Sequence, residues 1–434
     1  MNDASVWPSV ASLLIFVLTY FGIFAEKIHR SIIAIAGGAA MIVLGSWLSF
    51  YNAHDAVRAV DFDTITLLFG MMLVVGLFKE TGFFQYLAIR AAKLARGRPW
   101  LLLITLGLVT SLVSMVLDNV TTIIIIVPVT ISLADVLGIS ALPFVMAEVL
   151  LSNIGGVATL IGDPPNILIG SAAGFSFLDF LTHLAPIVFV VWILSQGLLL
   201  LIFRKELRRR PTNVERLLTM DAKRAIVDRP TTRRMLTALG ITIVLFLIHD
   251  AIGLDPGLVA LVGASIGLLW VRPDFENILK EIHWDVLLFF ISLFIIVGGL
   301  EASGVIGSIG TAVAFLAEQG IYVAVIVVVW VGALASGVVS NVPFTIAFLP
   351  ILKGLAAQGI AVTPLWWALA VGVGFGANLT PLGSAANVVV LSLSDSIGER
   401  ISFRRWLGTG TWVGFASCGA ATVLLLAAMW LDLL

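Results

Sequence analysis

The sequence Asn-Ile-Gly-Gly-Val-Ala-Thr-Leu-Ile-Gly-Asp-Pro-Pro-Asn, residues 153–166, interrupts a long apolar segment with Gly, Pro and a carboxylate. Lipid offers no partners to backbone N–H and C=O groups. A chain that leaves the helix inside a membrane must therefore be buried in protein or line a wet cavity. Polar breaks of this kind often form binding sites in transporters. We therefore predict a broken membrane helix that carries a substrate or ion site.

The composition indicates a polytopic membrane protein. Of the 434 residues, 60% are hydrophobic and 12% are charged, and the mean hydropathy is +1.09. A soluble domain carries about 25% charged residues. The net charge of −1 gives no electrostatic reason to expect a nucleic-acid partner. The single cysteine, Cys418, excludes a disulfide within the chain, and the five histidines lack metal-ligand spacing, so no cofactor or metal is expected.

Apolar runs long enough to cross a bilayer as helices recur along the whole chain. They predict an all-α membrane protein with about ten transmembrane helices and two re-entrant hairpins. The hairpins are expected at about 100–137 and 322–355, and two broken helices at about 142–170 and 364–393. Trp406 falls near the end of a predicted span, where tryptophan commonly anchors a helix in the interface.

One hydrophilic segment, residues 204–234, divides the chain. It holds 11 of the 25 Lys and Arg residues against four acidic residues. Cytoplasmic loops of membrane proteins collect Lys and Arg. We therefore expect a basic cytoplasmic linker between a first repeat at residues 1–203 and a second repeat at residues 235–434.

The two halves resemble one another in sequence. A shift of 222 residues takes Asp118-Asn119-Val120 onto Ser340-Asn341-Val342, and a shift of 221 takes Asn166 onto Asn387. Single matches arise by chance in apolar sequence, but one near-constant offset over more than half of the chain indicates an internal repeat.

The charges of equivalent loops give the orientation of the halves. The loop after the third predicted span holds Arg90, Lys93, Arg96 and Arg98, whereas the matching place in the second half holds only Glu318. Equivalent loops are therefore expected on opposite sides of the membrane, as in an inverted-topology repeat. This arrangement places both chain ends outside the inner (plasma) membrane and the linker inside the cell.

Four polar clusters interrupt the apolar sequence, at residues 118–122, 153–166, 340–345 and 378–387. They form two pairs under the repeat, so a pseudo-two-fold axis in the membrane plane would bring them together near the midplane. Their amides and hydroxyls offer both donors and acceptors, and the clusters contain no Lys or Arg. The predicted substrate-binding residues are Asn119, Thr122, Asn153, Thr159, Asn166, Ser340, Asn341, Asn378, Thr380, Ser384 and Asn387.

Three acidic residues, Asp163, Asp118 and Glu148, are the predicted proton-coupling groups. A carboxylate at membrane depth is costly, so it is expected to be paired, hydrated or protonated. Each also has a structural alternative. Asp163 precedes a proline and could form a turn. Asp118 could cap the helix that follows it, and Glu148 could form a pair with a neighbouring helix.

The stretches Leu117-Asp118-Asn119-Val120-Thr121-Thr122, Ser152-Asn153-Ile154-Gly155-Gly156 and Ile161-Gly162-Asp163-Pro164-Pro165-Asn166 resemble the ion transporter superfamily. They are most similar to its arsenite permease and melanosomal P-protein branch, over nearly the whole chain. The resemblance implies two inverted repeats of five spans and a hairpin, a homodimer, and a site-carrying domain that moves as an elevator against a scaffold.

The same resemblance implies an activity. Arsenite permeases are secondary transporters, not enzymes. They export arsenite and antimonite with the proton motive force, and some work with an arsenite-stimulated ATPase subunit. Arsenite is a neutral trihydroxide near pH 7, which amides and hydroxyls can bind. The predicted function is therefore export of arsenite and antimonite in exchange for protons.

Other functions remain open. The carboxylate-transporting relatives carry Ser-Asn-Thr at both hairpin tips to coordinate sodium. The tips here read Asp118-Asn119-Val120 and Ser340-Asn341-Val342, which disfavours sodium-coupled carboxylate uptake. NhaD-type sodium/proton antiporters share the fold and remain an alternative because of Asp118 and Asp163, as does another anion permease of the superfamily. A membrane-embedded enzyme is disfavoured by the repeat and by the lack of a His or Cys cluster.

Overall fold

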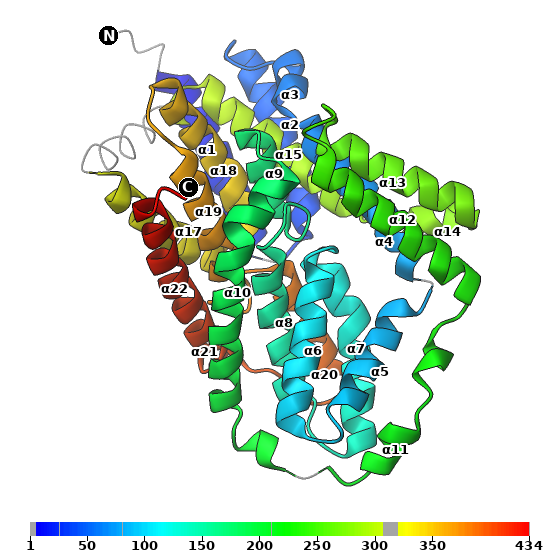
Figure 1. Ribbon diagram of the computed structural model, residues 1–434. Helices are drawn as coiled ribbons and strands as arrows, with labels where there is room; N and C mark the ends of the chain where they lie inside the picture. Colours follow the sequence, from blue (N-terminus) through cyan, green and yellow to red (C-terminus); the bar gives the residue numbers. More distant parts are fainter. Residues whose placement is uncertain (1–5, 26, 80, 210, 307–319, 434) are drawn as a thin grey trace.

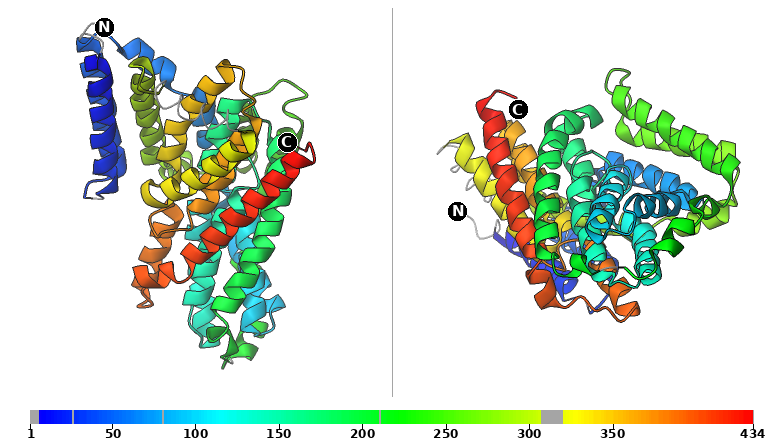
Figure 2. Two further views of the ribbon diagram at one scale, coloured as in Figure 1. Left: turned by 90° about the vertical axis from the view of Figure 1, so that its left-hand side faces the viewer. Right: turned by 60° about the horizontal axis from the view of Figure 1, so that its bottom comes forward.

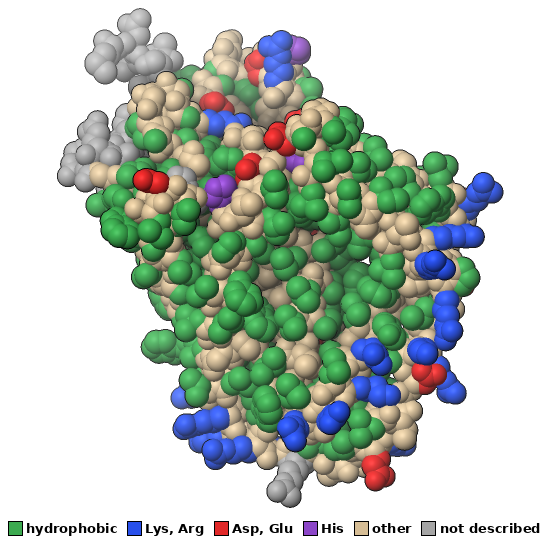
Figure 3. All heavy atoms as spheres, in the orientation of Figure 1, with side chains coloured by type: hydrophobic (Ala, Val, Ile, Leu, Met, Phe, Trp, Pro, Cys, Tyr) green, Lys and Arg blue, Asp and Glu red, His purple; other side chains and the backbone are tan. Residues whose placement is uncertain are grey.

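The computed structural model of the protein describes residues 6–25, 27–79, 81–209, 211–306 and 320–433. Within these ranges all regular elements are helices, which pack into one elongated body (Figure 1). Hydrophobic side chains cover the middle of the face in Figure 3, whereas charged side chains gather toward its margins. Such a surface suits a body that spans lipid, and it agrees with the predicted all-α membrane fold.

The helices follow one another in two series joined by a linker. The first series is α1 (Val6–Phe24), α2 (Arg30–Trp47), α3 (Ala53–Ala59), α4 (Phe62–Lys79), α5 (Phe83–Leu94), α6 (Pro99–Ser114), α7 (Asn119–Leu137), α8 (Leu142–Gly156), α9 (Pro164–Ala173) and α10 (Phe177–Ile202). The linker contains η2 (Glu206–Arg208), α11 (Val214–Thr219) and η3 (Ala222–Ala225). The second series is α12 (Arg229–Ile248), α13 (Pro256–Val271), α14 (Phe275–Glu281), α15 (Trp284–Ala302), α17 (Ile321–Val339), α18 (Asn341–Ala357), α19 (Thr363–Gly376), α20 (Ala385–Ser396), α21 (Phe403–Leu407) and α22 (Gly410–Trp430).

The second series repeats the first. A shift of 222 residues takes the first residues of α3, α4, α6 and α7 onto the first residues of α14, α15, α17 and α18. A shift of 221 does the same for α8 and α9 with α19 and α20. Glu318, on which part of the charge argument depends, lies outside the described residues. The repeated element order follows from the repeated pattern of apolar runs and helix breakers in the sequence.

Eight described helices are long and apolar enough to cross a membrane by length and composition. Two of these, α7 and α17, are hairpin arms; the other six are α2, α4, α10, α12, α15 and the α21–α22 segment. The shorter apolar helices α1 and α13 add two spans, and the broken pairs α8–α9 and α19–α20 add one each. This assignment gives the predicted ten spans, because a helix that breaks in mid-membrane crosses as two short pieces.

The two hairpins approach the centre from opposite ends of the body. In Figure 1, α6 and α7 lie in the lower half, whereas α17 and α18 lie in the upper half. Their tips meet the broken helices, since α7 packs against α20 and α18 packs against α9. Opposed hairpins of this kind are what an inverted repeat requires.

The helices form two packing groups. The peripheral group consists of α1, α2, α4, α12, α13 and α15, and the hairpin group consists of α6–α10, α17–α20 and α22. The groups touch where α4 packs on α9, α15 on α18, and α10 on α12. The hairpin group thus holds all four predicted polar clusters, and the peripheral group borders it.

The linker lies along the lower end of the body in Figure 1. Lys93 Nζ donates to Met220 O at 2.7 Å, and Thr212 N donates to Leu137 O at 3.0 Å. The helix α12 begins at Arg229, before the predicted boundary of the second repeat. It begins there because Asp228 accepts a hydrogen bond from Thr231 N at 3.1 Å, as a helix cap does.

An ion pair fastens the linker to the second half, and its strength is expected to depend on pH. Arg405 Nη2 donates to Glu206 Oε1 at 2.7 Å. Burial alone would raise the pKa of Glu206, but the hydrogen bond and charge of Arg405 bring that pKa below its ordinary value. A lowered carboxyl pKa stabilises the fold at pH values above the ordinary pKa, and the contribution is lost as pH falls through the lowered value.

We therefore expect Arg405→Gln to destabilise the protein by up to about 1 kcal/mol at pH 7 and by less below about pH 4, because the pair is half-exposed. Thermal unfolding in detergent at several pH values measures the difference. The control is Arg400→Gln, whose pair with Asp395 is more exposed and is expected to contribute nothing measurable. The prediction would be contradicted if Arg405→Gln lowered the unfolding temperature by the same amount at pH 7 and at the acidic pH.

Candidate functional site

Two breaks in helices form the centre of the hairpin group. The helix α8 ends at Gly156 and α9 begins at Pro164, whereas α19 ends at Gly376 and α20 begins at Ala385. Glycines allow the chain to fold closely on itself at these places. An added Cβ at Gly162 would lie 2.5 Å from Gly156 O and 2.7 Å from Ser114 O. The break therefore needs glycine for steric room.

Each break is held by an asparagine of its own helix pair, which we call the Asn clamp. Asn166 Nδ2 donates to Gly156 O at 3.3 Å, Val157 O at 3.1 Å and Thr159 O at 2.8 Å. Buried carbonyls that leave a helix need such partners. Asn166 is fully buried, and its amide is committed to the backbone in this conformation.

The second clamp matches the first under the repeat. Asn387 Nδ2 donates to Ala377 O at 2.8 Å and Thr380 O at 3.0 Å. A hydroxyl then pins each break to the neighbouring hairpin, because Thr159 Oγ1 donates to Met115 O and Thr380 Oγ1 donates to Gly337 O. These contacts give both asparagines and both threonines a structural task, and their contact with substrate stays a prediction.

A closed network of side chains joins the two breaks. Asn153 Nδ2 donates to Asn378 Oδ1 at 2.8 Å and to Asn387 Oδ1 at 3.0 Å. Ser384 Oγ donates to Asn153 Oδ1 at 3.2 Å, and Asn378 Nδ2 donates to Leu150 O at 3.1 Å. All four side chains are buried. A substrate that contacts this network would have to replace bonds that the amides already make to one another.

Asp163 lies at the meeting point of both hairpin tips. Asn341 Nδ2 lies 3.3 Å and 3.4 Å from its two carboxylate oxygens. Asp163 is 2% exposed and makes no capping bond to α9. Asn119 occupies the equivalent position at the first tip, so the two repeats offer the same amide at both hairpin tips.

The equivalent residue in the second half behaves differently. Ser384 caps α20, since Ala386 N donates to Ser384 Oγ at 3.1 Å. The structure therefore brings an acidic group to one break and a hydroxyl group to the other. Two neighbouring amides and a carboxylate can hold a proton, a cation or the hydroxyls of a neutral solute.

At the tip of the first hairpin Asp118 caps α7. Thr121 N donates to Asp118 Oδ1 at 2.9 Å, and Thr121 Oγ1 donates to Asp118 Oδ2 at 2.6 Å. This is the structural alternative for Asp118, although its charge also acts on Asp163. Thr122 Oγ1 is buried and has no hydrogen-bond partner among the described residues. A buried hydroxyl without a partner is costly, and a bound solute or water would relieve that cost.

At the tip of the second hairpin Ser340 occupies a strained conformation. Its φ is +81°, a region that favours glycine. The strain turns the chain sharply between α17 and α18, so that Asn341 opens α18 and reaches Asp163. Backbone strain at a ligand-facing turn is a feature of many binding sites.

Glu148 lies apart from this centre, on α8 against α7. Thr130 Oγ1 donates to Glu148 Oε1 at 2.5 Å, and Oε2 has no partner among the described residues. Glu148 is 1% exposed. The pair with Thr130 is the structural alternative for this residue, and its part in proton coupling stays a prediction.

Three residues that the sequence analysis did not select belong to the site. Ser114 Oγ donates to Asn119 Oδ1 at 2.5 Å, and Ser152 Oγ donates to Ser114 Oγ at 3.0 Å. Trp406, expected as an interfacial anchor, is instead fully buried and donates from Nε1 to Asn378 O at 3.0 Å. The repeat could have identified Ser114, because a shift of 222 takes it onto Ser336. Ser336 Oγ donates to Val373 O at 2.7 Å, just as Ser114 Oγ donates to Ser152 O at 2.9 Å.

The described residues contain no group of three or more His, Cys, Asp or Glu that could hold a metal ion. The clamps, the amide network and the two tips include no Lys or Arg. The centre is therefore a polar site of amides and hydroxyls that lacks basic groups and has Asp163 and Asp118 as its acidic members.

The steric demand at Gly162 gives a testable prediction. Gly162→Ala is expected to destabilise the protein by at least about 2 kcal/mol, because the new methyl group would collide with backbone carbonyls. Gly197→Ala in α10 is the control, since a Cβ there meets nothing within 4 Å and alanine favours the helix. Unfolding midpoints in detergent measure both. Equal midpoints for the two variants would contradict the expected close approach.

Comparisons with known proteins agree with this architecture. Residues 20–372 match a family model described as citrate transporter. An uncharacterized transporter of Mycobacterium bovis is 38% identical over 423 residues, which cover 96% of this chain and 98% of that protein. The human P protein is 33% identical over 494 residues, covering 94% of this chain and 58% of that protein.

A solved structure supports the fold alone. The Alcanivorax borkumensis YdaH transporter, described as having an unusual topology, aligns with a TM-score of 0.60 at 15% identity. The alignment covers 99% of both chains.

Proposed function

Because the chain belongs to the citrate transporter family of the ion transporter superfamily, and is thus a multi-pass membrane transporter, we propose that it exports arsenite and antimonite in exchange for protons. Asn119, Asn153, Asn341 and Asn378 would hold the substrate, and Thr159, Thr380 and Ser384 would assist. Asp163 would carry the proton, with Asp118 beside it. Movement of the hairpin group against the peripheral group would provide alternating access.

The observation that carries the proposal is the setting of Asp163. The carboxylate is buried and accepts hydrogen bonds from the Asn341 amide at the tip of the second hairpin. A buried carboxylate favours a bound proton because desolvation penalises its charge. A proton that neutralises Asp163 would change these hydrogen bonds, which links proton binding to the position of the second hairpin.

The chemistry of the site favours a neutral cargo. Arsenite presents three hydroxyls, and the amides and hydroxyls of the site can both donate to them and accept from them. A polyanion such as citrate would meet Asp163 and Asp118, with no Lys or Arg among the site residues to balance its charge. Membership of a citrate transporter family therefore does not by itself assign citrate to this chain.

Sodium/proton exchange is the second candidate. A carboxylate among amide and hydroxyl oxygens is also a suitable ligand set for a hard cation. Asp163 would then bind sodium and protons in turn.

The orientation and partners belong to the same proposal. In Figure 1, and in the left view of Figure 2, the start of α1 and the end of α22 lie in the upper half, whereas the linker lies at the bottom. Blue side chains in Figure 3 gather on the lower and right margins. With the positive-inside rule, this supports termini outside the inner membrane and a cytoplasmic linker. A homodimer and an ATPase subunit are partners that the arsenite permease resemblance suggests.

Reconstitution of the purified protein in liposomes tests the function. An imposed pH gradient is expected to drive arsenite uptake against its own gradient, and empty liposomes are the control. Parallel samples receive sodium or citrate in place of arsenite. Proton movement with sodium alone would support the second candidate, and citrate uptake with no response to arsenite would overturn the proposal.

A further inference from the structure

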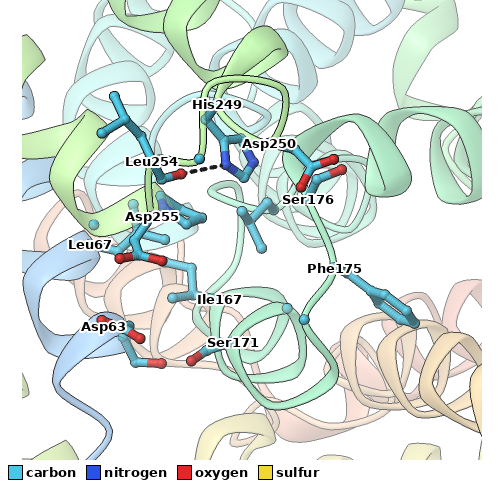
Figure 4. Close-up of a pocket in the computed structure, with 17 residues that line it drawn as sticks. Asp63, Leu67, Ile167, Ser171, Phe175, Ser176, His249, Asp250, Leu254 and Asp255 are labelled. Atoms are coloured by element: carbon cyan, nitrogen blue, oxygen red, sulfur yellow. Dashed lines mark hydrogen bonds between the residues drawn. The ribbon is translucent and has the colours of Figure 1, made fainter.

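A cavity of about 290 Å³ lies at the boundary between the two helix groups. The peripheral group provides the start of α4 and the loop between α12 and α13, and the hairpin group provides α9 and the start of α10. Figure 4 shows His249 on the loop side of this cavity and Ile167 and Ser171 of α9 on the other side. The cavity therefore marks a place where the groups must separate or slide if they move.

His249 joins the two groups through one hydrogen bond. Phe177 N, in the first turn of α10, donates to His249 Nε2 at 3.2 Å. The other ring nitrogen, Nδ1, lies 2.9 Å from Leu254 O. The ring thus ties the α12–α13 loop to itself and to the hairpin group, and the histidine is 5% exposed.

These contacts fix the protonation state of the ring. A backbone N–H can only donate, so Nε2 must carry a lone pair. A carbonyl can only accept, so Nδ1 must carry the proton. The ring is therefore neutral, because protonation of Nε2 would place two N–H groups against each other. This hydrogen bond between His249 and Phe177 N forms only in the neutral state of the ring.

The N-terminal end of α10 also disfavours a protonated His249. Phe177 N is one of the first N–H groups of the helix and has no partner inside it. The N-terminus of a helix carries a partial positive charge, so a cationic ring there is repelled. Ser176 and Asp179 already form the local cap, with Asp179 N donating to Ser176 Oγ at 3.1 Å. His249 thus accepts the hydrogen bond of Phe177 N–H, which the Ser176–Asp179 cap does not satisfy.

Acidic groups surround the same cavity. Asp250 and Asp255 line it from the α12–α13 loop, and Asp63 lines it from α4 (Figure 4). Beside it Asp61 Oδ2 accepts from Ser171 Oγ at 2.6 Å, a second bond between the groups. A protonated ring would have no lone pair left for the Phe177 N–H. Histidine is the side chain whose ordinary change of charge falls at physiological pH, so acid is expected to act on this hydrogen bond.

We propose that His249 is a proton-operated latch: neutral, it holds α10 to the α12–α13 loop, and protonated, it releases α10 from that loop and so loosens the hairpin group from the peripheral group at this end. In the proposed orientation the cavity lies toward the outside, opposite the linker. Protons that drive export would then also free the hairpin group to move. Only this physiological meaning rests on the proposed function, since the latch itself is a property of the conformation.

Spin labels measure the latch without any substrate. Leu178 on α10 and Ile252 on the loop are exposed apolar residues near the contact, at 46% and 49% exposure. Cysteines at both positions, in a Cys418→Ala background, carry the labels. Their distance distribution is recorded by pulsed electron resonance between about pH 8 and about pH 5.5.

The short distance is expected to prevail at high pH, and a longer one to gain at least about threefold in population at low pH. One coupled proton allows at most about tenfold per pH unit. His249→Gln can still accept from Phe177 N and cannot become cationic, so its distribution is expected to stay short throughout. Tyr20→Phe is the matched control. It removes another bond between the groups, Tyr20 Oη to Pro343 O at 2.7 Å, which does not titrate in this range.

Two results would overturn the latch. One is a distance distribution that does not change with pH in the spin-labelled protein that keeps His249. The other is the same pH response in His249→Gln as in its parent. Failure of arsenite transport with an intact pH response would reject the proposed function and leave the latch standing.

Discussion

Replacing Asp163 with Asn is expected to reduce proton-driven arsenite transport to the level of empty liposomes. The variant keeps a side chain of the same shape, which can accept a hydrogen bond from Asn341, but it cannot bind and release a proton. The rate of arsenite uptake under an imposed pH gradient measures the loss. Exchange of labelled for unlabelled arsenite, which needs no net proton movement, is expected to persist.

The control for this variant is Asp135→Asn. Asp135 is an exposed acidic residue on α7 of the same helix group, and its replacement is expected to leave uptake unchanged. If Asp163→Asn still concentrates arsenite when a pH gradient is applied, the proton is carried elsewhere. Glu148 would then be the next residue to test, because among the described residues it is the other carboxylate buried between membrane helices.

Asn153→Ala is expected to cause the largest loss of stability among these variants. The side chain donates to Asn378 and Asn387 and accepts from Ser384, all of them buried. Each partner that is left without a bond costs about 1–3 kcal/mol in a protein interior, although bonds between membrane helices average about 0.6 kcal/mol. We therefore expect a loss of roughly 2–5 kcal/mol, measured as the unfolding free energy in detergent or mixed micelles.

Two comparisons separate this effect from a general one. Asn213→Ala removes an exposed asparagine of the linker that forms no capping bond, and it is expected to change stability by less than about 0.5 kcal/mol. Asn378→Ala alone and combined with Asn153→Ala completes a double-mutant cycle. Because the two amides share a bond, the combined loss is expected to be smaller than the sum. Additive losses would show that the network is not a unit.

The sequence predicted the main architecture because the same pattern of helix breakers and polar residues occurs in both halves. Asp118 and Asn119 map onto Ser340 and Asn341, and both pairs lie at hairpin tips where helices begin. Gly and Pro placed the breaks to within a few residues. These signals are local and depend on backbone chemistry, which makes them legible without a structure.

The partners of each polar side chain could not be predicted in the same way. Asn153 and Asn166 flank the same break. The amide of Asn166 donates to the backbone of that break, whereas the amide of Asn153 donates to side chains of the opposite repeat. Asparagine offers donors and an acceptor in every setting, so only the packing decides which are used. His249 gave no signal at all, because its partners are a backbone N–H and a carbonyl, which every residue provides.

The two Asn clamps also bear on ancestry. Each clamp is complete within its own half, since the amide nitrogens of Asn166 and Asn387 donate only to carbonyls of their own breaks. A single half could therefore form its broken helix before any second copy was fused to it. Asp163 and Ser384, by contrast, occupy equivalent places with different chemistry, so this difference arose after the duplication. The shared frame is therefore older than the feature that distinguishes the two halves.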